Sequence, residues 1–224
     1  MLSRPTSFVV VRHGHTSANG GLAGMRMSGW TDTPLSREGE REALEVAARL
    51  RREPSFAALY ASPLQRAVRT AAPISEAVGL AVQLEPGLRE ISCGTVDGRS
   101  IEEVRTRNAE AWRRNAEERL EDFRWPGGES YREFRARCLR ALRRLSRRHP
   151  GERVLLVTHA GFISQVLGWA HGITCARWSA YRPANASITR LEWDRGLICV
   201  LGFDAREHLT ASPKVPATSP PPAG

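Results

Sequence analysis

The feature that most constrains the fold is an apolar run near the start of the chain that ends abruptly in charged and small residues. Residues 7–11 are β-favouring and mostly apolar, and Arg12, His13 and Gly14 follow them directly. This pattern is typical of a buried parallel strand that ends in a tight turn. In an open α/β sheet, ligands bind beyond the carboxyl ends of the strands. We therefore expect Arg12 and His13 at the mouth of a site.

The chemistry of this pair favours an anion whose central atom is attacked. An arginine guanidinium binds two oxygens in a fork, and a neutral imidazole is a nucleophile near pH 7. Gly14 lets the backbone turn close to whatever occupies the site. A histidine after a strand is also often only a hydrogen-bonded loop residue, so this motif alone does not decide the function.

A second apolar run, residues 154–158, ends in the same way, at His159. If the two strands are neighbours at the centre of the sheet, His13 and His159 face each other across one crevice. Another predicted strand covers residues 56–61, and a helix follows it. Ser62 is expected to cap this helix, with Gln65 completing the capping box, so Arg66 lies in its first turn. Helix N-termini bind anions. Cationic side chains that converge in this way indicate an anion with several oxygens, and phosphate fits best.

Hydrolysis of a phosphate ester also requires a proton donor for the leaving alkoxide. Glu90 follows a short strand, 81–84, on a loop that could reach the crevice. A carboxylate there could equally be the ion-pair partner of an arginine. From the residues alone, both roles stay open.

Strand and helix patterns alternate along most of the chain and close with a hairpin at 188–203. This order predicts an α/β protein, a three-layer α/β/α sandwich with a mostly parallel central sheet and an antiparallel edge. We expect a single domain over residues 1–204 and a disordered tail rich in Pro, Ala and Ser over 205–224. The predicted helices are 37–51, 63–79, 100–120, a long helix after the break at 125–130, and 160–170.

The net charge of +9 comes almost entirely from arginine, since Lys214 is the only lysine. A basic balance favours acidic partners, either phosphorylated small molecules or nucleic acid. The long helix predicted after residue 130 carries many arginines. Phe134 belongs to its apolar stripe, and the arginines lie on the opposite face, where no aromatic residues interleave as base-stacking platforms. A solvated face is therefore favoured, and we expect no nucleic-acid partner. The arginines are Arg132, Arg135, Arg137, Arg140, Arg143, Arg144, Arg147 and Arg148.

The cysteines and the apolar runs bear on metal binding and on the cellular location of the protein. The four cysteines are far apart, with no C-x-x-C pair, so we expect reduced and mostly buried thiols and no metal site. No apolar run is long enough to span a membrane, and residues 1–6 have no export signal. A cytoplasmic protein without a membrane partner is expected, and a homodimer is compatible with the sequence.

Five motifs, in order, resemble those of the histidine phosphatase superfamily, which includes the cofactor-dependent phosphoglycerate mutases. The resemblance covers about residues 7–200. Two departures could alter substrate fit: His15 replaces a more usual Gln or Glu, and residues 94–98 lack the family's aromatic and glutamate. The motifs are RHGHT at 12–16 with Asn19, SPLQRA at 62–67, LRE at 88–90, PGGES at 126–130 and VTHAG at 157–161.

The resemblance implies a role for each candidate residue. His13 becomes a phosphohistidine, while Arg12, Arg66 and His159 hold the phosphoryl oxygens. Glu90 is the general acid and later the base, and Asn19 supports the phosphate pocket. The implied enzyme is a histidine acid-type phosphatase, a phosphomonoesterase for a small phosphorylated metabolite that needs no metal and no cofactor.

The alternative is phosphoryl transfer of the phosphoglycerate mutase type. The mutases carry a longer insertion between the acid and the second histidine motif, with its own signature. Here the interval from Glu90 to Pro126 is short and lacks it. A shorter cover leaves the phosphohistidine open to water, so hydrolysis is favoured over transfer.

Overall fold

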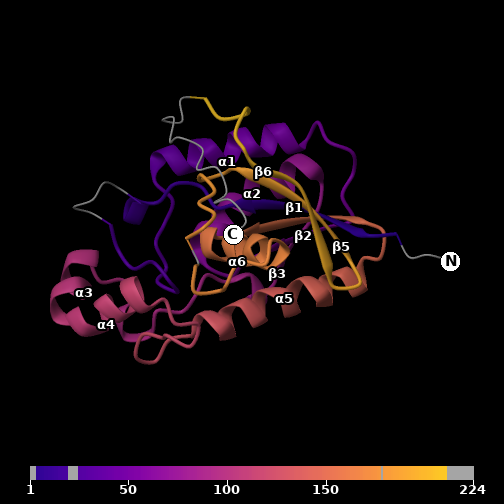
Figure 1. Cartoon of the computed structure of the whole chain (residues 1–224). Coiled ribbons are helices and arrows are strands. Elements are labelled where there is room, and N and C mark those ends of the chain that lie inside the picture. Colours follow the sequence, from indigo (N-terminus) through magenta and orange to yellow (C-terminus); the bar gives the residue numbers. More distant parts are fainter. Residues whose placement is uncertain (1–3, 20–24, 178, 211–224) are drawn as a thin grey trace.

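The computed structural model describes residues 4–19, 25–177 and 179–210. Within them, six strands form one sheet in the order β3-β2-β4-β1-β5-β6, with helices on both faces (Figure 1). β3, β2, β4 and β1 are parallel, and β5 and β6 form an antiparallel edge, as predicted. The strands are β1 (Thr6–Arg12), β2 (Ala58–Ala61), β3 (Val82–Leu84), β4 (Arg153–Thr158), β5 (Ile188–Asp194) and β6 (Leu197–Ala205).

The helical elements come in two kinds. The longer helices are α1 (Arg37–Leu50), α2 (Gln65–Val78), α5 (Tyr131–Arg148) and α6 (Ala160–Ala170). The short elements are η1 (Ser17–Asn19), η2 (Pro86–Leu88), η3 (Gly94–Val96), α3 (Ile101–Arg107), α4 (Ala109–Arg113) and the π-helical turn η4 (Arg114–Glu118).

The first strand lies at the centre of the sheet, where its neighbours fix the place of both histidines. β1 pairs with β4 in a register that sets Arg12 opposite Thr158. The backbone N–H of His13 then donates to the carbonyl of Thr158 at 2.9 Å. Because the two strands are parallel and end together, His13 and His159 lie side by side.

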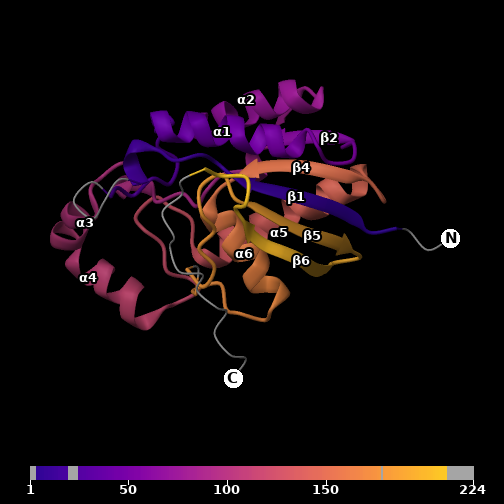
Figure 2. The same ribbon diagram turned by 90° about the horizontal axis from the view of Figure 1, so that it is seen from above.

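Two hydrophobic clusters hold the sandwich together, one on each face of the sheet. Val9 and Val11 face α1 and α2, whereas Phe8 and Val10 face α5 and α6, and all four are buried. A parallel strand covered on both faces is apolar at every position, which explains the continuous apolar run in the sequence. Figure 2 shows α1 and α2 on one side of the sheet and α5 and α6 on the other.

The arginine-rich helix α5 begins with a capping box between Ser130 and Glu133. Its buried stripe includes Phe134, Cys138, Leu142 and Leu145, where truncation of one leucine to alanine costs about 2–5 kcal/mol. The expectation of a single solvated arginine face is wrong for two members. Arg135 donates to Gln165 and to the carbonyl of Ile173, and Arg137 donates to several groups described below.

One predicted helix is broken in the structure. Ser100 caps α3 as expected, but the helix stops at Asn108, whose backbone leaves the helical region. α4 and η4 follow, and together the three elements lie beyond the carboxyl ends of the strands (Figures 1 and 2). We call residues 101–118 the covering segment. Asparagine is unfavourable inside a helix, although the Oδ1 of Asn108 has no hydrogen-bond partner among the described residues.

The first residues of the expected disordered tail, 205–210, belong to the folded domain. Ala205 is the last residue of β6, Leu209 packs against the cluster on the α1 side, and the backbone N–H of Thr210 donates to Glu45. Residues 211–224 lie outside the described residues, and their disorder stays a prediction. No helix in the described parts of the chain is long and apolar enough to cross a membrane. Three cysteines are buried, Cys199 is exposed, and all four are free.

Candidate active site

The structure brings five of the predicted residues together at the carboxyl ends of the strands. Arg12, His13, Arg66 and Glu90 line a cavity of about 350 Å³. His159 is the N-cap of α6 and is fully buried behind His13, with their ring centroids 5.1 Å apart. The cavity lies at the predicted edge of the sheet, but the expectation that the two histidines face each other across it is wrong, because His159 is buried and only His13 lines the cavity.

One ring nitrogen of His13 is held, and the other makes no hydrogen bond with a described residue. Its Nδ1 lies 2.8 Å from the carbonyl oxygen of Gly14, an acceptor, so Nδ1 carries the proton. The backbone N–H of Gly14 in turn donates to Thr70 Oγ1 at 3.0 Å. Burial lowers the pKa of His13 well below its ordinary value, and the charges of Arg66 and Arg12 lower it further. The ring is thus neutral, with the Nε2 lone pair available.

His159 has partners on both ring nitrogens. Nδ1 accepts from Arg66 Nε at 3.2 Å, so the proton is on Nε2, which contacts Ser62 Oγ at 2.8 Å. Burial, and then the charge of Arg66, lower the pKa of His159 well below its ordinary value. In this arrangement His159 donates to Ser62. Its donation to a phosphoryl group stays a prediction.

Arg66 is buried, and most of its donors are engaged. Besides His159, its guanidinium donates to the carbonyls of Thr31, Ser28 and Gly29 at 2.8, 3.0 and 2.8 Å. Four of its five N–H groups are therefore engaged by described residues. Burial lowers the pKa of Arg66, and the charge of Glu90 opposes this effect.

Arg12 is the cation whose hydrogen bonding is least complete. Nη1 donates to the carbonyl of Pro183 at 2.7 Å, but the buried Nε has no partner among the described residues. Burial lowers the pKa of Arg12 to about 10, so the group is still charged at neutral pH. A buried donor without a partner is costly. A bound anion would remove that cost.

Glu90 lies at the N-terminus of α6. One carboxylate oxygen accepts from its neighbour Ile91 N and the other from Gly161 N, each at 2.9 Å. A β-carbon at Gly161 would collide with Glu90 Oε1. This close approach explains the glycine of the VTHAG motif.

The loop that carries Glu90 is fixed from α5 by Arg137. This side chain donates to the carbonyls of Gly87, Arg89 and Glu90 at 2.9–3.1 Å, and twice to Glu129 at 2.7 Å. Sequence reasoning missed Arg137 and also missed Ser62 as the partner of His159. Arg137 is one of many arginines on the same helix, so the sequence does not distinguish it. Ser62 was already assigned as a helix cap, so no contact with a distant residue was expected of it.

The remaining wall of the cavity is mostly apolar. Trp112 and Trp125 both line it, with ring centroids 6.5 Å apart. Other lining residues include Met25, Met27, Ile101, Phe123 and Tyr131. The predicted site residue Asn19 ends η1, and its side chain lies outside the described part of the structure. Across the described residues, no three His, Cys, Asp or Glu side chains are placed to hold a metal ion.

Both histidines follow adjacent parallel strands, and arginines and a carboxylate lie beside them, an arrangement suited to a phosphoryl group. The model of the histidine phosphatase superfamily (branch 1) matches residues 8–203. The chain belongs to this superfamily.

Similar proteins include both mutases and phosphatases by name. "Probable phosphoglycerate mutase GpmB" of Enterobacter sp. (strain 638) is 34% identical over 184 residues, 82% of this chain and 83% of that protein. A mycobacterial glucosyl-3-phosphoglycerate phosphatase superimposes with a TM-score of 0.76 at 27% identity, covering 91% of this chain and 100% of that one. YhfR of Bacillus stearothermophilus gives a TM-score of 0.80 at 27% identity, covering 91% and 98%. Together they support a phosphatase or a mutase.

Proposed function

We propose that the protein is a metal-independent phosphomonoesterase that hydrolyses a small phosphorylated metabolite through a phosphohistidine at His13. The observation that carries this proposal is the state of the His13 ring. Nδ1 is held by Gly14, Nε2 is free, and an incompletely bonded Arg12 lies beside it. A cytoplasmic location is part of the same proposal, because small phosphorylated metabolites are made and used there.

In the first step, Nε2 of His13 attacks phosphorus, and the bond between phosphorus and the ester oxygen breaks. The leaving alkoxide takes a proton from the Glu90 carboxylic acid. In the second step, Glu90 takes a proton from water, which attacks the phosphohistidine and releases inorganic phosphate. Arg12 neutralises charge on the phosphoryl oxygens in both steps.

Mutase-type transfer is the second candidate, and the names of the 34% identical relatives favour it. The solved phosphatase neighbours and the short covering segment favour hydrolysis. With 3-phosphoglycerate as substrate, release of inorganic phosphate without formation of 2-phosphoglycerate would support hydrolysis. Isomerisation faster than phosphate release would support the mutase.

The covalent step is tested by rapid quenching with ³²P-labelled substrate and alkaline workup, which preserves phosphohistidine. His13→Ala should retain no label. His159→Ala should still become labelled, but about a hundredfold more slowly, if His159 stabilises the transition state as an oxyanion donor does. Label retained by His13→Ala and lost from His159→Ala would reverse the two roles.

A further inference from the structure

The outer edge of β6 is an open sheet edge that lacks the usual protection. β6 is the last strand in the sheet order, and its outer side makes no backbone hydrogen bond with any described residue. Residues 197–203 include no charged residue and no proline. Open edges pair readily with other chains, and proteins usually prevent this with charged residues, proline, bulges or very short strands. The opposite edge strand, β3, has only three residues.

A row of apolar side chains lies beside this open edge. Leu197, Cys199 and Leu201 lie on one face of β6 and are exposed, Leu197 by 76% and Leu201 by 55%. Ile198 and Val200 point to the other face and pack against the core on the α5 and α6 side. A bulge interrupts the pairing with β5, but only beyond Val200. The regular part of the strand therefore presents both apolar side chains and unpaired backbone groups.

The hairpin turn determines which backbone groups of β6 point outward. Arg195 and Gly196 have φ of 48° and 98°, so they form a two-residue turn of type I′ between β5 and β6. The residues that flank such a turn are hydrogen-bonded to each other, and the direction of the backbone groups alternates from there. Counting on from Leu197, Ile198 and Val200 direct their N–H and C=O groups to the open edge.

A second copy of the chain matches this edge by symmetry. Two antiparallel β6 strands, related by a two-fold axis at Cys199, set Leu197 opposite Leu201 of the second copy. Ile198 then exchanges hydrogen bonds with Val200 of the second copy. The two Cys199 residues form the closer, non-hydrogen-bonded kind of pair, with Cα atoms about 4.5 Å apart. Apolar side chains thus meet apolar side chains along the whole row.

Other occupants match the edge less well. Residues 211–224 of the same chain contain five prolines, which have no N–H group for a ladder. A charged partner would find no opposite charge on residues 197–203. We propose that the open edge of β6 is the interface of a homodimer, in which the sheets of two copies join edge to edge about an axis at Cys199.

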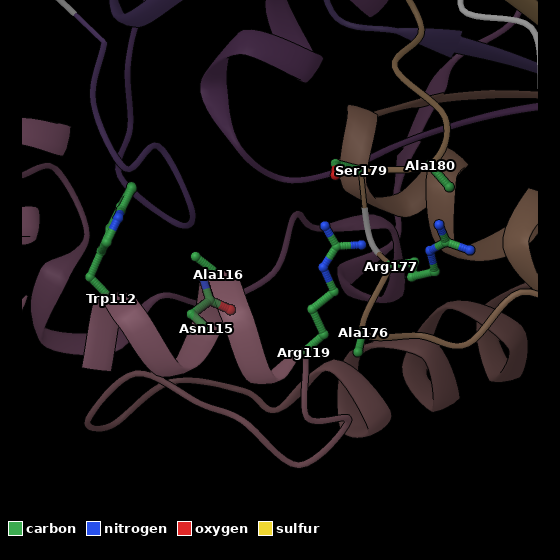
Figure 3. Close-up of a pocket in the computed structure, with 8 residues that line it drawn as sticks. All are labelled: Trp112, Asn115, Ala116, Arg119, Ala176, Arg177, Ser179 and Ala180. Atoms are coloured by element: carbon green, nitrogen blue, oxygen red, sulfur yellow. The ribbon is translucent and has the colours of Figure 1, made fainter. Parts of the chain in front are cut away.

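The dimer makes no demand on the candidate active site. β6 runs parallel to β1, so the carboxyl ends of the two β1 strands point in opposite directions in the dimer. No residue of β6 lines the cavity at His13 or a second cavity, of about 380 Å³, beside the covering segment (Figure 3). We therefore expect the same kcat/KM for 4-nitrophenyl phosphate in the monomer and in the dimer.

Analytical ultracentrifugation of the full chain tests the interface. Five paired residues make a small interface, so the mass should rise from that of one chain to that of two as the concentration rises through the micromolar range. Leu197→Lys should stay monomeric where the wild type is dimeric, because its charge would lie against an apolar side chain. Leu44→Lys, at an exposed leucine of α1, is the matched control and should leave the dimer intact.

A double variant tests the register of the pairing. In Leu197→Lys/Leu201→Glu, the two substituted side chains are about 13 Å apart along one strand, too far to pair with each other. Across the proposed axis, each charge lies opposite its counterpart in the second copy, so the dimer should return. The return would also show that Leu197→Lys did not act by unfolding the protein.

Oxidation with diamide provides a second measure of the register. Two Cys199 thiols form a disulfide and give up their hydrogens, which reduce the azo group of diamide to a hydrazine. The other three cysteines are buried, and the expected Cα separation of about 4.5 Å allows the bond. The wild type should give a covalent dimer, and Cys199→Ser should give none. Leu197→Lys should lower the yield at least tenfold, although its thiol stays exposed.

Four outcomes would overturn the inference. The first is a wild type that stays monomeric at every concentration, and the second is a dimer that survives Leu197→Lys. The third is a dimer that Leu84→Lys on β3 dissociates, and the fourth is a double variant that does not recover. A monomeric wild type that dimerises only after removal of residues 211–224 would assign the edge to the end of its own chain.

Discussion

His13 and His159 occupy equivalent places at the ends of neighbouring strands, but their ring nitrogens have different partners. Nδ1 of His13 donates to a backbone carbonyl, and its Nε2 has no hydrogen-bond partner among the described residues. His159 accepts from Arg66 and contacts Ser62. The difference follows from local geometry. The carbonyl of Gly14 lies beside Nδ1 of the first ring, whereas the second ring lies between a serine and an arginine.

Both rings should resist protonation in the folded protein. Their pKa values are lowered by burial first and by neighbouring arginines second. Ring signals followed by NMR, assigned with His13→Gln and His159→Gln, should stay those of neutral imidazole at pH 5.5. A midpoint at pH 6.5 or above would contradict this expectation.

The same shifts make folding stability depend on pH. Below about pH 6.5 the unfolded chain binds protons that the folded rings exclude. The free energy of unfolding should therefore fall as the pH drops below 6.5 and should gain nothing from these rings above it. Urea titrations should show a shallower fall for the double variant His13→Gln/His159→Gln.

Glu90→Gln should distinguish a proton donor from an ion-pair partner. Glutamine keeps the shape but has no transferable proton, so kcat for alkyl phosphates should fall by about 10²–10⁴-fold. An aryl phosphate such as 4-nitrophenyl phosphate leaves without protonation and should lose far less. Equal losses on the two substrates would mean that Glu90 only orients a neighbour.

At the scale of elements, α5 positions the loop after η2 through a single side chain. All five N–H groups of Arg137 have partners, three of them backbone carbonyls of residues 87, 89 and 90. Glu129 completes this clamp, because it also accepts from the backbone N–H of Ser92 at 2.9 Å. The candidate acid is thus held in place by α5, which also contributes Tyr131 and Phe134 to the cavity wall.

Arg137→Lys should weaken both the fold and the proton transfer. Lysine cannot reach several carbonyls at once, and the acceptors left behind cost about 2 kcal/mol in the free energy of unfolding. We expect kcat for alkyl phosphates to fall about tenfold, with KM little changed, because the carboxylate loses alignment.

Two comparisons isolate this positioning role. Arg140→Lys, one turn further along the same helix, should change neither stability nor kcat. In a Glu90→Gln background, Arg137→Lys should have almost no further effect on kcat. A full additional tenfold loss there would show that Arg137 acts other than through Glu90.

The elements themselves could largely be predicted from the sequence. Apolar runs ending at a histidine placed β1 and β4, and the cap signature at Ser100 placed the start of α3. The start of α2 could not be predicted, because the Ser62 hydroxyl contacts His159 and the helix begins only at Gln65, whose N–H donates to Asp32. The cap pattern at Ser62 involves only neighbouring residues, so it cannot predict the contact with His159, 97 residues away in sequence.

At the scale of the whole molecule, the sheet order brings the site together. β1 lies between β4 and β5, and β2 lies beyond β4, so residues from four distant segments meet at one edge. The convergence of both histidines could be predicted from the parallel strands alone. The cavity walls could not, because the covering segment and the chain after α6 meet only through tertiary packing.

The proposed metal independence concerns the whole site. Arginines and histidines occupy the positions around the proposed phosphoryl group where a metal enzyme would place carboxylate ligands. Hydrolysis of 4-nitrophenyl phosphate should therefore continue unchanged in 5 mM EDTA. Loss of activity with the chelator, restored by a divalent cation, would contradict the proposed mechanism.

The carbonyl contacts of Arg66 make phosphate binding a competition. Ser28, Gly29 and Thr31 occupy three of the N–H groups that a phosphoryl oxygen would need. In the proposed complex, phosphate can accept from those N–H groups only after the carbonyls release them. The hydrogen bonds from Arg66 to residues 28–31 therefore oppose phosphate binding, and phosphate binding weakens those hydrogen bonds in turn. A substitution that loosens this docking would strengthen phosphate binding, although it removes contacts from the folded chain.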